Sequence, residues 1–468
     1  MPEIRYVKVT DGYIAKKAGD PAGKTSNISK LLGARLHVDL ASQANGWAPV
    51  TDTRDSQGIV RAGFINLGFV SEKQQLKVFY TDVGQGDAVL IEAEGGIVII
   101  DGGPNKGFHD VLKHRLRSLR QADQDAGLAP RRTLFINAVV VTHFDLDHYY
   151  GLKAVFENPD FEIGTLYHNG LPRYGEGSGK DLALGDVIEH RDDTRSISTD
   201  LKDLASAKAL VASNLLKTKS GGDNKFSKFL QAVIAAEHAG RVGSMRRLVR
   251  RNVDGPPALL PNAGPGLQFE ILGPVTTKTN GNIRLPVFFD PHDVTAKNPT
   301  PAASSSHTIN GNSIVLRLRY KNVRFMFGGD LNQPAQKYLA LKYGGTNPFK
   351  VHVNKACHHG SSDFDLDYLK AVSPDATVFS SGDNGSYDHP LPDAMGAAAK
   401  HSQGDFPLVF STELARDNKT SGKFKLGHIN ARSNGDVIVM AQKKEKPSAK
   451  NPWHTFSLPY SGPFSNDH

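Results

Sequence analysis

The centre of this sequence reads Phe135-Ile136-Asn137-Ala138-Val139-Val140-Val141-Thr142-His143-Phe144-Asp145-Leu146-Asp147-His148. Residues 135–141 are apolar except for Asn137, which is typical of a strand that is covered on both faces of its sheet. Two imidazoles and two carboxylates follow within residues 143–148. Burying so many ionisable groups together without a cation would cost a large amount of free energy. The pattern therefore predicts a metal site at the end of a central strand.

Strands and helices alternate on both sides of this segment. Residues 76–81 and 88–92 are largely apolar, and the strand expected at 97–100 stops at Asp101-Gly102-Gly103. A helix is expected over 111–119. Strands alternating with helices recur after Gln268, so the sequence predicts an α/β fold.

Residues 171 to about 265 interrupt the alternation. Two helical stretches are expected there, at 201–216 and 226–237, flanked by Gly and Ser. We interpret the segment as a helical insertion into a catalytic domain of residues 76–445, with a C-terminal tail at 446–468. Arginines crowd at the end of this insertion, at positions 241, 246, 247, 250 and 251.

The first 75 residues form a separate small β unit in this interpretation. Short strand-like stretches alternate there with Gly, Asp and Ser turns. The segments Gly46-Trp47-Ala48-Pro49-Val50 and Gly58-Ile59-Val60 resemble consecutive strands of a bacterial SH3-like barrel. That resemblance implies either a packed appendage or a module that recognises a protein or another ligand.

Composition narrows the function further. The chain has 468 residues, and 56 Lys and Arg against 48 Asp and Glu leave a net charge of +8, which permits a polyanionic partner. The single cysteine, Cys357, excludes an intramolecular disulfide framework and a Cys-rich zinc module. Residues 1–10 lack a secretory pattern, and no apolar run approaches the ~20 residues of a membrane helix. We therefore expect a cytoplasmic protein with no membrane partner.

The His143-x-Asp145-x-Asp147-His148 pattern resembles the His-x-His-x-Asp-His motif of the metallo-β-lactamase fold, in the variant of the DNA-uptake protein ComEC and its relatives. Further segments follow in that family's order: Asp82–Ala88, Ile99–Gly103, Asn312–Leu316, Phe327–Asp330, His358-His359-Gly360-Ser361 and Tyr387-Asp388-His389-Pro390. The resemblance covers about residues 76–440, less the insertion. It implies an αββα sandwich that holds two divalent metal ions.

The resemblance also implies a role for each motif residue. His143 and Asp145 would hold one ion, Asp147 and His148 the other, and Asp330 would bridge them. His358 or His359 would complete the shell of the second ion. Asp147 and Asp101 would belong to the catalytic machinery, Asp101 by hydrogen-bonding the ligand loop, and His389 would protonate the leaving oxygen or hold a phosphate.

This sequence departs from the general family pattern at two places. Asp145 stands where the general motif has its second His, and this harder oxygen ligand favours Mn²⁺ relative to an all-His site, so either zinc or manganese fits. The third-motif His before Ser313 has no counterpart at the expected place. His307 lies six residues upstream of Ser313, and Asn310 or Asn312 would offer a weak oxygen ligand instead.

Two ions with an activated water suit the hydrolysis of phosphodiesters, and equally of other esters or lactams. The leading hypothesis is a metal-dependent nuclease that cleaves DNA, with Arg246, Arg247 and Lys355 as candidate contacts to anionic substrate. The arginines would equally suit a solvated helix face. A hydrolase of a small anionic or ester substrate is the first alternative, and a non-catalytic adaptor on a hydrolase scaffold is the second.

Overall fold

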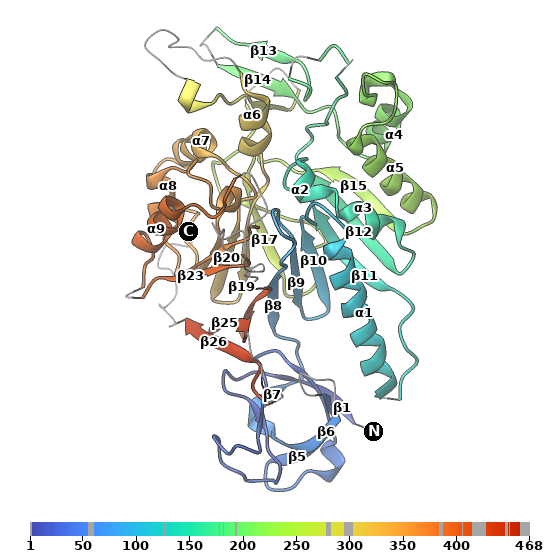
Figure 1. Ribbon diagram of the computed structural model, residues 1–468, viewed down its shortest axis with the longest axis vertical. Coiled ribbons are helices and arrows are strands. Elements are labelled where there is room, and N and C mark those ends of the chain that lie inside the picture. The colour runs from blue at the N-terminus through green and yellow to red at the C-terminus, as the bar shows by residue number, and fades with distance from the viewer. Residues whose placement is uncertain are drawn as a thin grey trace, which may run out of the picture.

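The computed structural model describes residues 2–54, 60–125, 127–176, 178–180, 182–191, 194–277, 282–293, 303–382, 387–404, 406–413, 427–444, 448 and 450–458. In this part of the chain, two large sheets pack face to face and helices cover their outer faces (Figure 1). The predicted α/β fold with an αββα sandwich is confirmed. A smaller β unit, formed by the N-terminus, lies at one end of the sandwich.

The first large sheet has nine strands in the order β15-β12-β11-β10-β9-β8-β24-β25-β26 within the described residues. Its strands are β8 (Leu76–Tyr80), β9 (Val89–Ala93), β10 (Gly96–Ile100), β11 (Leu134–Val140), β12 (Phe161–His168), β15 (Val242–Arg247), β24 (Ile429–Ser433), β25 (Ile438–Lys443) and β26 (Trp453–Leu458). Strands β10, β11, β12 and β15 are parallel. Their carboxyl ends therefore share one edge of the sheet, where the polar residues 142–148 begin.

The second large sheet has seven strands in the order β16-β17-β19-β20-β21-β22-β23, again within the described ranges. They are β16 (Ala258–Leu259), β17 (Gln268–Gly273), β19 (Val315–Tyr320), β20 (Val323–Phe327), β21 (Val353–Lys355), β22 (Ala376–Phe379) and β23 (Leu408–Ser411). Strands β20 to β23 are parallel. The main core lies between the two sheets and joins residues such as Val78 and Ile91 to Leu316 and Phe325.

Helices pack on the outer face of each sheet. Those on the nine-stranded sheet are α1 (Gly107–Asp125), α2 (Leu146–Tyr149), α3 (Leu152–Glu157), α4 (Leu204–Ala212) and α5 (Lys225–His238). The seven-stranded sheet carries α7 (Gln333–Tyr343), α8 (Leu366–Val372) and α9 (Pro392–Lys400). Helix α1 packs against its sheet through one apolar stripe, because its buried residues recur at helical spacing: Phe108, Leu112, Leu116 and Leu119.

The segment predicted as an insertion is partly integral to the core. Its two expected helices are present as α4 and α5, but the following residues form β15, an edge strand of the nine-stranded sheet. The arginines at 246 and 247 therefore lie on a strand, and the helix-face interpretation is wrong for them. Strands β13 (Val187–Glu189) and β14 (Arg195–Ser198) of this segment form a small sheet with β18 (Arg284–Pro286), which follows the segment in sequence. This sheet lies near α6 (Ser305–Gly311) (Figure 1).

The predicted tail at 446–468 also needs correction where the structure describes it. Residues Trp453–Leu458 form β26, which pairs antiparallel with β25 and so extends the nine-stranded sheet. The apolar ends of this strand explain the pairing, since Leu458 is buried in the main core.

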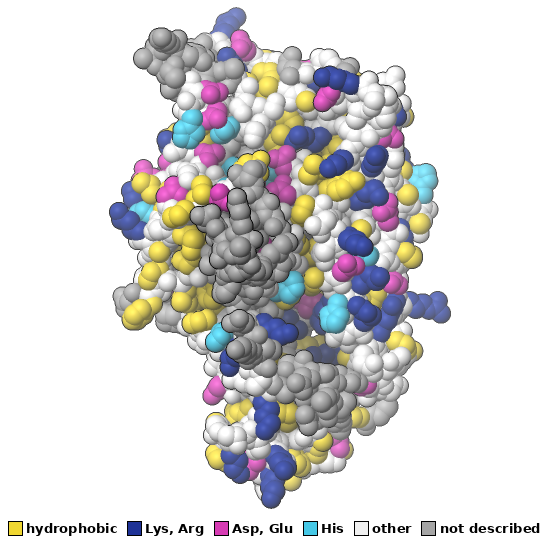
Figure 2. Space-filling model, viewed as in Figure 1, with side chains coloured by type: hydrophobic (Ala, Val, Ile, Leu, Met, Phe, Trp, Pro, Cys, Tyr) yellow, Lys and Arg dark blue, Asp and Glu magenta, His cyan; other side chains and the backbone are white. Residues whose placement is uncertain are grey.

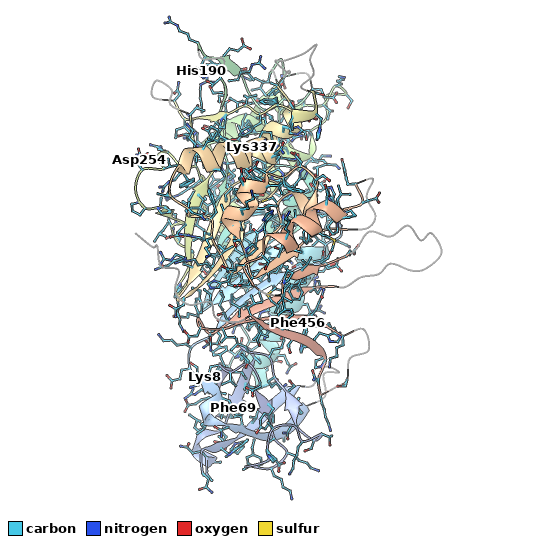
Figure 3. The ribbon with its side chains drawn as sticks, turned by 90° about the vertical axis from the view of Figure 1, so that its left-hand side faces the viewer. Lys8, Phe69, His190, Asp254, Lys337 and Phe456 are labelled. Carbon is cyan, nitrogen blue, oxygen red and sulfur yellow. The ribbon has the colours of Figure 1, made fainter. Side chains whose placement is uncertain are left out.

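The N-terminal unit is an antiparallel sheet of order β6-β5-β4-β1-β7 beside a short β2-β3 hairpin. Its strands are β1 (Glu3–Val7), β2 (Tyr13–Ile14), β3 (Ile28–Ser29), β4 (Arg35–Val38), β5 (Trp47–Arg54), β6 (Val60–Asn66) and β7 (Val70–Ser71). It has its own apolar cluster, which includes Leu36 and Ile65. Figure 3 places Lys8 and Phe69 of this unit at the end of the molecule opposite His190, with Phe456 of β26 beside the unit. The SH3-like assignment stays a prediction.

Within the described ranges, no helix is both long enough and apolar enough to cross a bilayer.

Candidate metal centre

The metal-ligand candidates lie at the carboxyl ends of parallel strands from both sheets. Thr142–His148 follows β11, and α2 begins within that segment at Leu146. Asp330 follows β20, and His358 and His359 follow β21. Since the two sheets pack face to face, these loop ends converge across the same edge of the sandwich.

Four side-chain atoms converge there. His359 Nε2 lies 3.1 Å from Asp330 Oδ2 and 3.3 Å from Asp147 Oδ2. His148 Nε2 lies 3.2 Å from Asp330 Oδ2 and 3.2 Å from His359 Nε2. A tetrahedral ion with bonds of about 2.0–2.1 Å separates its ligand atoms by roughly 3.3 Å. The spacing of His148 Nε2, Asp330 Oδ2 and His359 Nε2 therefore matches a single divalent metal ion. Asp147 Oδ2 is close to His359 and is a candidate fourth ligand.

These four donors are buried or half-buried and carry the charge that a cation requires. Asp330 and His359 are almost fully buried, and Asp147 is half-buried. Burial acts to raise the pKa of Asp147 and of Asp330, but the neighbouring His148 and His359 outweigh it and hold both pKa values below their usual range. Both carboxylates are therefore ionised at neutral pH, which is the state that binds metal.

Two further buried atoms of candidate ligands have no hydrogen-bond partner in the described part of the chain. Among the described residues, His143 Nε2 and Asp330 Oδ1 are buried and have no hydrogen-bond partner. Asp145 Oδ2 lies 3.8 Å from His143 Nε2. Buried polar atoms are nearly always satisfied, so the unpartnered His143 Nε2 fits a site that is completed by a cation. Asp330 Oδ1 already lies 3.8 Å from the Lys355 ammonium. The two-ion arrangement remains a prediction from the resemblance.

Asp101 hydrogen-bonds the ligand loop in the way that the resemblance implies. Its Oδ1 accepts from the Thr142 amide at 2.8 Å, and its Oδ2 accepts from Thr142 Oγ1 at 2.7 Å. Oδ2 also lies 2.9 Å from His148 Nδ1, on the ring edge opposite the converging Nε2. A carboxylate in this position sets the tautomer and orientation of a ligating imidazole.

Asp87 is a buried carboxylate to which the sequence interpretation assigned no role. Asp87, His148, Asp330 and His359 form a group of potential ligands within 4.8 Å of one another. Asp87 Oδ1 lies 3.4 Å from His359 Nδ1, and Oδ2 lies 3.9 Å from His148 Nδ1. Asp87 thus lies beside the Nδ1 edges of both rings as a negative charge. The hydrogen bonds that orient these rings go to the Ser380 carbonyl, 2.9 Å from His359 Nδ1, and to Asp101 from His148 Nδ1. Its position inside the Asp82–Ala88 motif was the available signal.

Lys355 does not lie where a substrate contact was expected. Its side chain is 2% exposed, and its ammonium group contacts Asp87 Oδ2. The same ammonium lies 3.8 Å from Asp330 Oδ1 and donates to the Gly329 carbonyl at 3.1 Å. Burial acts to lower the pKa of Lys355, but Asp87 and Asp330 outweigh it, so the pKa lies above its ordinary value. Lys355 is a buried counter-charge for the site, because its alkyl stem belongs to the interior strand β21.

The two neighbouring histidines separate in space. His359 joins Asp330 and Asp147, whereas His358 Nε2 lies 3.4 Å from Asn310 Nδ2. Both histidines have left-handed φ values, 50° and 55°, which turn consecutive side chains to different sides. Of the alternatives for the absent third-motif ligand, Asn310 lines the cleft beside His358, and its Oδ1 has no hydrogen-bond partner among the described residues. His307 also lines the cleft, where its Nε2 lies 3.4 Å from Asp363.

Arg173 is a second residue that sequence reasoning missed. Its Nη1 donates to Asp145 Oδ1 at 2.8 Å, so it holds the carboxylate that replaces the second His of the general motif. No motif carried this signal, because Arg173 lies in the loop after β12 and reaches Asp145 only through the fold.

His389 lies beside the centre and is stacked between two rings. Its ring centroid is 6.3 Å from that of His359 and 5.6 Å from that of Tyr387. Its Nδ1 lies 3.2 Å from Gln85 Nε2. Burial, followed by repulsion from His359 and His358, lowers the pKa of His389 to about 4. The imidazole is therefore neutral at neutral pH.

The centre opens into a cleft of about 780 Å³. The walls include Asp145, Asp147, Asp330, His359 and Tyr387. Figure 2 shows His, Asp and Glu side chains gathered between α6 and α2 in the upper half of the face in view. Arg246 and Arg247 do not line this cleft; they line a separate groove.

Comparison with known proteins gives the site a family context. Competence protein ComA of Neisseria gonorrhoeae is 39% identical over 82 residues, which are 17% of this chain and 12% of ComA. The chain thus matches about an eighth of the length of that relative.

Solved structures also align at low identity. The metallo-beta-lactamase fold protein YhfI of Bacillus subtilis is 8% identical, with 73% of this chain and 98% of YhfI covered and a TM-score of 0.32. CmlA, a diiron beta-hydroxylase of Streptomyces venezuelae, is 11% identical, with 74% of this chain and 55% of CmlA covered and a TM-score of 0.31. A diphosphatase of the PhnP family is 11% identical, with 76% of this chain and 98% of the diphosphatase covered and a TM-score of 0.30.

A family model identifies the part of the chain that carries the ligand loop. Residues 81–206 match the model described as Metallo-beta-lactamase superfamily. This range contains β9 to β12, the Asp101 turn and the loop 142–148. The part of the chain that holds the candidate ligand loop, residues 81–206, is therefore similar to the metallo-beta-lactamase superfamily.

Proposed function

We propose that the chain is a divalent-metal-dependent phosphodiesterase that cleaves DNA. The observation that carries the proposal is the convergence of His148, His359, Asp147 and Asp330 at metal-ligand spacing beside an open cleft. The superfamily match supports metal-dependent hydrolysis. DNA as the substrate rests on the resemblance to the ComEC subset and on the partial similarity to a competence protein.

The proposed enzyme would use two ions, zinc or manganese, as the family resemblance implies. Asp147, His148, Asp330 and His359 would hold one of them, and His143, Asp145 and Asp330 would hold the other. When bound, such ions supply Lewis acidity and lower the pKa of a coordinated water. The donor set of imidazoles and carboxylates is suitable for either metal.

The side chains around the ligands perform the remaining tasks. Asp101 and the Ser380 carbonyl hold the two ligand imidazoles through their Nδ1 atoms, so the Nε2 atoms stay aimed at one point. His389 faces the cleft with a neutral ring, which can accept or relay a proton at the substrate side. Arg173 holds Asp145 and would keep that loop in place while substrate binds.

A small anionic or ester substrate remains the second candidate. Its supporting observation is the size of the cleft, about 780 Å³, which falls within the range of ordinary small-molecule sites. The adaptor alternative gains no support, because an inert scaffold would not need a buried, charged donor set at this spacing.

The test combines metal analysis with substrate cleavage. The full chain, loaded with Mn²⁺ or Zn²⁺, is incubated with linear, circular and single-stranded DNA, with bis-p-nitrophenyl phosphate and with a lactone. Asp330→Asn should lose bound metal and turnover. The matched control is Asp367→Asn on α8, because the Asp367 side chain is 82% exposed and pairs only with Lys370 among the described residues.

Each outcome decides between the alternatives. Cleavage of DNA and of the diester supports the proposal. Cleavage of the small substrates alone would replace it with the second candidate, and absence of both metal and turnover would favour the adaptor. The proposed cytoplasmic location and a ligand for the SH3-like unit remain separate predictions.

A further inference from the structure

A second hollow lies apart from the metal cleft. It is a groove of about 420 Å³, lined by Lys202, Asp203, Met245, Arg246, Arg247, Leu248, Val249, Arg251 and Ile283. Four of these residues are cations and one is an acid. Lys202, Arg246 and Arg251 are exposed, and Arg247 is half-buried.

The groove is formed where two segments distant in sequence pair. The Arg247 amide donates to the Lys202 carbonyl at 2.9 Å, and Asp203 forms an antiparallel bridge with Arg246. This pairing places Lys202 beside the end of β15. The cations therefore gather through backbone pairing, not through attraction to an acidic partner.

The single acid in the groove does not neutralise the cations. Asp203 is the N-cap of α4, where its Oδ1 accepts from the Ser206 amide at 2.9 Å. Within the described residues, none of the four cations forms an ion pair with any carboxylate at 4.0 Å or less. The groove thus keeps uncompensated positive charge that faces solvent.

One arginine in the groove is held in place. Arg247 Nη1 donates to the Thr199 carbonyl at 2.9 Å and to Thr199 Oγ1 at 2.7 Å. Its alkyl stem packs over Gly170, where an added Cβ would lie 2.5 Å from Arg247 Cδ. Any larger residue than glycine at position 170 would displace this guanidinium. A fixed guanidinium loses little entropy when it binds an anion.

Two other arginines of the sequence cluster are structural. Arg241 donates to the carbonyls of Asn158, Phe161 and Phe156. Arg250 donates to the carbonyls of Pro256 and Gly255. Only Arg246, Arg247 and Arg251 of the five line the groove.

The groove shares a sheet edge with the metal centre. Strands β11, β12 and β15 are adjacent and parallel, so the end of β15 lies on the same edge as the loop that follows β11. With neighbouring strands about 4.8 Å apart, the two strand ends are separated by roughly 10 Å. One strand of duplex DNA carries a phosphate about every 3.4 Å of helix rise, so this distance spans roughly three nucleotides.

We infer that the groove of Lys202, Arg246, Arg247 and Arg251 binds the phosphate backbone of a polynucleotide whose scissile bond lies at the metal centre. The inference rests on the proposed function and narrows its substrate to a polymer, since a small diester cannot reach both places. Exposed cations beside one fixed guanidinium suit a chain of phosphates, which are contacted without regard to base sequence.

The test removes two cations, Arg246 and Arg251, whose guanidinium groups form no hydrogen bond or ion pair within the described part of the chain. The double variant Arg246→Gln with Arg251→Gln is compared with Lys228→Gln with Lys337→Gln, two exposed lysines outside the groove. Binding of fluorescein-labelled 20-nucleotide DNA, single-stranded and duplex, is measured by anisotropy in EDTA across a salt series. Metal-loaded protein is assayed in parallel on DNA and on bis-p-nitrophenyl phosphate.

The groove variant should bind duplex DNA roughly tenfold more weakly, and its salt slope should fall by about 1.8, or 0.9 for each lost phosphate contact. Turnover of bis-p-nitrophenyl phosphate should be unchanged. A salt slope equal to that of the control variant overturns the inference. The groove variant is also tested with a labelled poly-glutamate probe. If its affinity for this probe falls as much as its affinity for DNA, the inference is overturned in favour of an acidic protein partner. Failure to cleave either diester would refute the proposed function while the EDTA binding series still decides the role of the groove.

Discussion

The Lys355–Asp87 pair offers a direct test of how the metal centre is held together. Both side chains are buried, with exposures of 2% and 4%, and they are in contact. Replacing Lys355 by Met keeps most of the side-chain volume but leaves the Asp87 carboxylate buried without its cation. Breaking a buried pair in this way costs about 3–5 kcal/mol, because the remaining carboxylate stays out of water and keeps only the His359 and His148 rings beside it.

We therefore expect Lys355→Met to lower the free energy of unfolding of the metal-free protein by about 3–5 kcal/mol, which is roughly a hundredfold to several thousandfold in the folding equilibrium. Urea unfolding followed by circular dichroism measures this free energy of unfolding for the wild type and the variant. The double variant Lys355→Met with Asp87→Asn removes both charges and should be more stable than the sum of the single effects predicts.

The matched control is the Lys370–Asp367 pair on α8, which has side-chain exposures of 56% and 82% and a separation of 2.7 Å. A double-mutant cycle on this exposed pair should give a coupling of about 0.5 kcal/mol or less. A coupling that small between Lys355 and Asp87 would refute the buried counter-charge.

Three further perturbations have defined outcomes. Asp101→Asn should weaken metal affinity about 10–100-fold by chelator competition, because His148 loses its carboxylate partner; unchanged affinity would contradict the arrangement. EDTA should lower the melting temperature of the wild type, since a ligand at 100 times its Kd stabilises by about 2.7 kcal/mol, and Asp330→Asn should abolish this shift. Burial, followed by repulsion from Arg115, lowers the pKa of Lys77 to about 7. Folded protein then binds fewer protons than unfolded protein between pH 7 and 10.5, so wild-type stability should rise with pH in that window, and more steeply than that of Lys77→Met.

The ligand loop was predictable because its residues are contiguous. His143, Asp145, Asp147 and His148 lie on one strand end, and a crowded set of ionisable groups has few explanations other than a cation. Asp330 and His359 became candidates only through the resemblance to a family. Their spacing in sequence carries no information about distance, yet the structure brings both within 3.3 Å of another candidate ligand.

The positive charge of a residue did not by itself predict where that residue lies or what it contacts. Lys355 was a candidate contact to anionic substrate, but its strand runs through the interior and its ammonium contacts Asp87. The arginines between 241 and 251 look alike in sequence. Arg241 and Arg250 bind backbone carbonyls of neighbouring segments, whereas Arg246 and Arg251 face a groove. Which neighbour each one meets depends on chain segments far away.

Local pattern thus determined the class of the fold and made residues 143–148 candidate metal ligands, because apolar runs and adjacent ligand side chains act over a few residues. Packing of the two sheets determined three further features. His359 and not His358 lies with Asp330, and Asp87 and Lys355 are buried beside this cluster. Strand β15 carries its arginines to the same sheet edge. These outcomes follow from long-range strand pairing and burial, which place side chains together that the linear chain keeps apart.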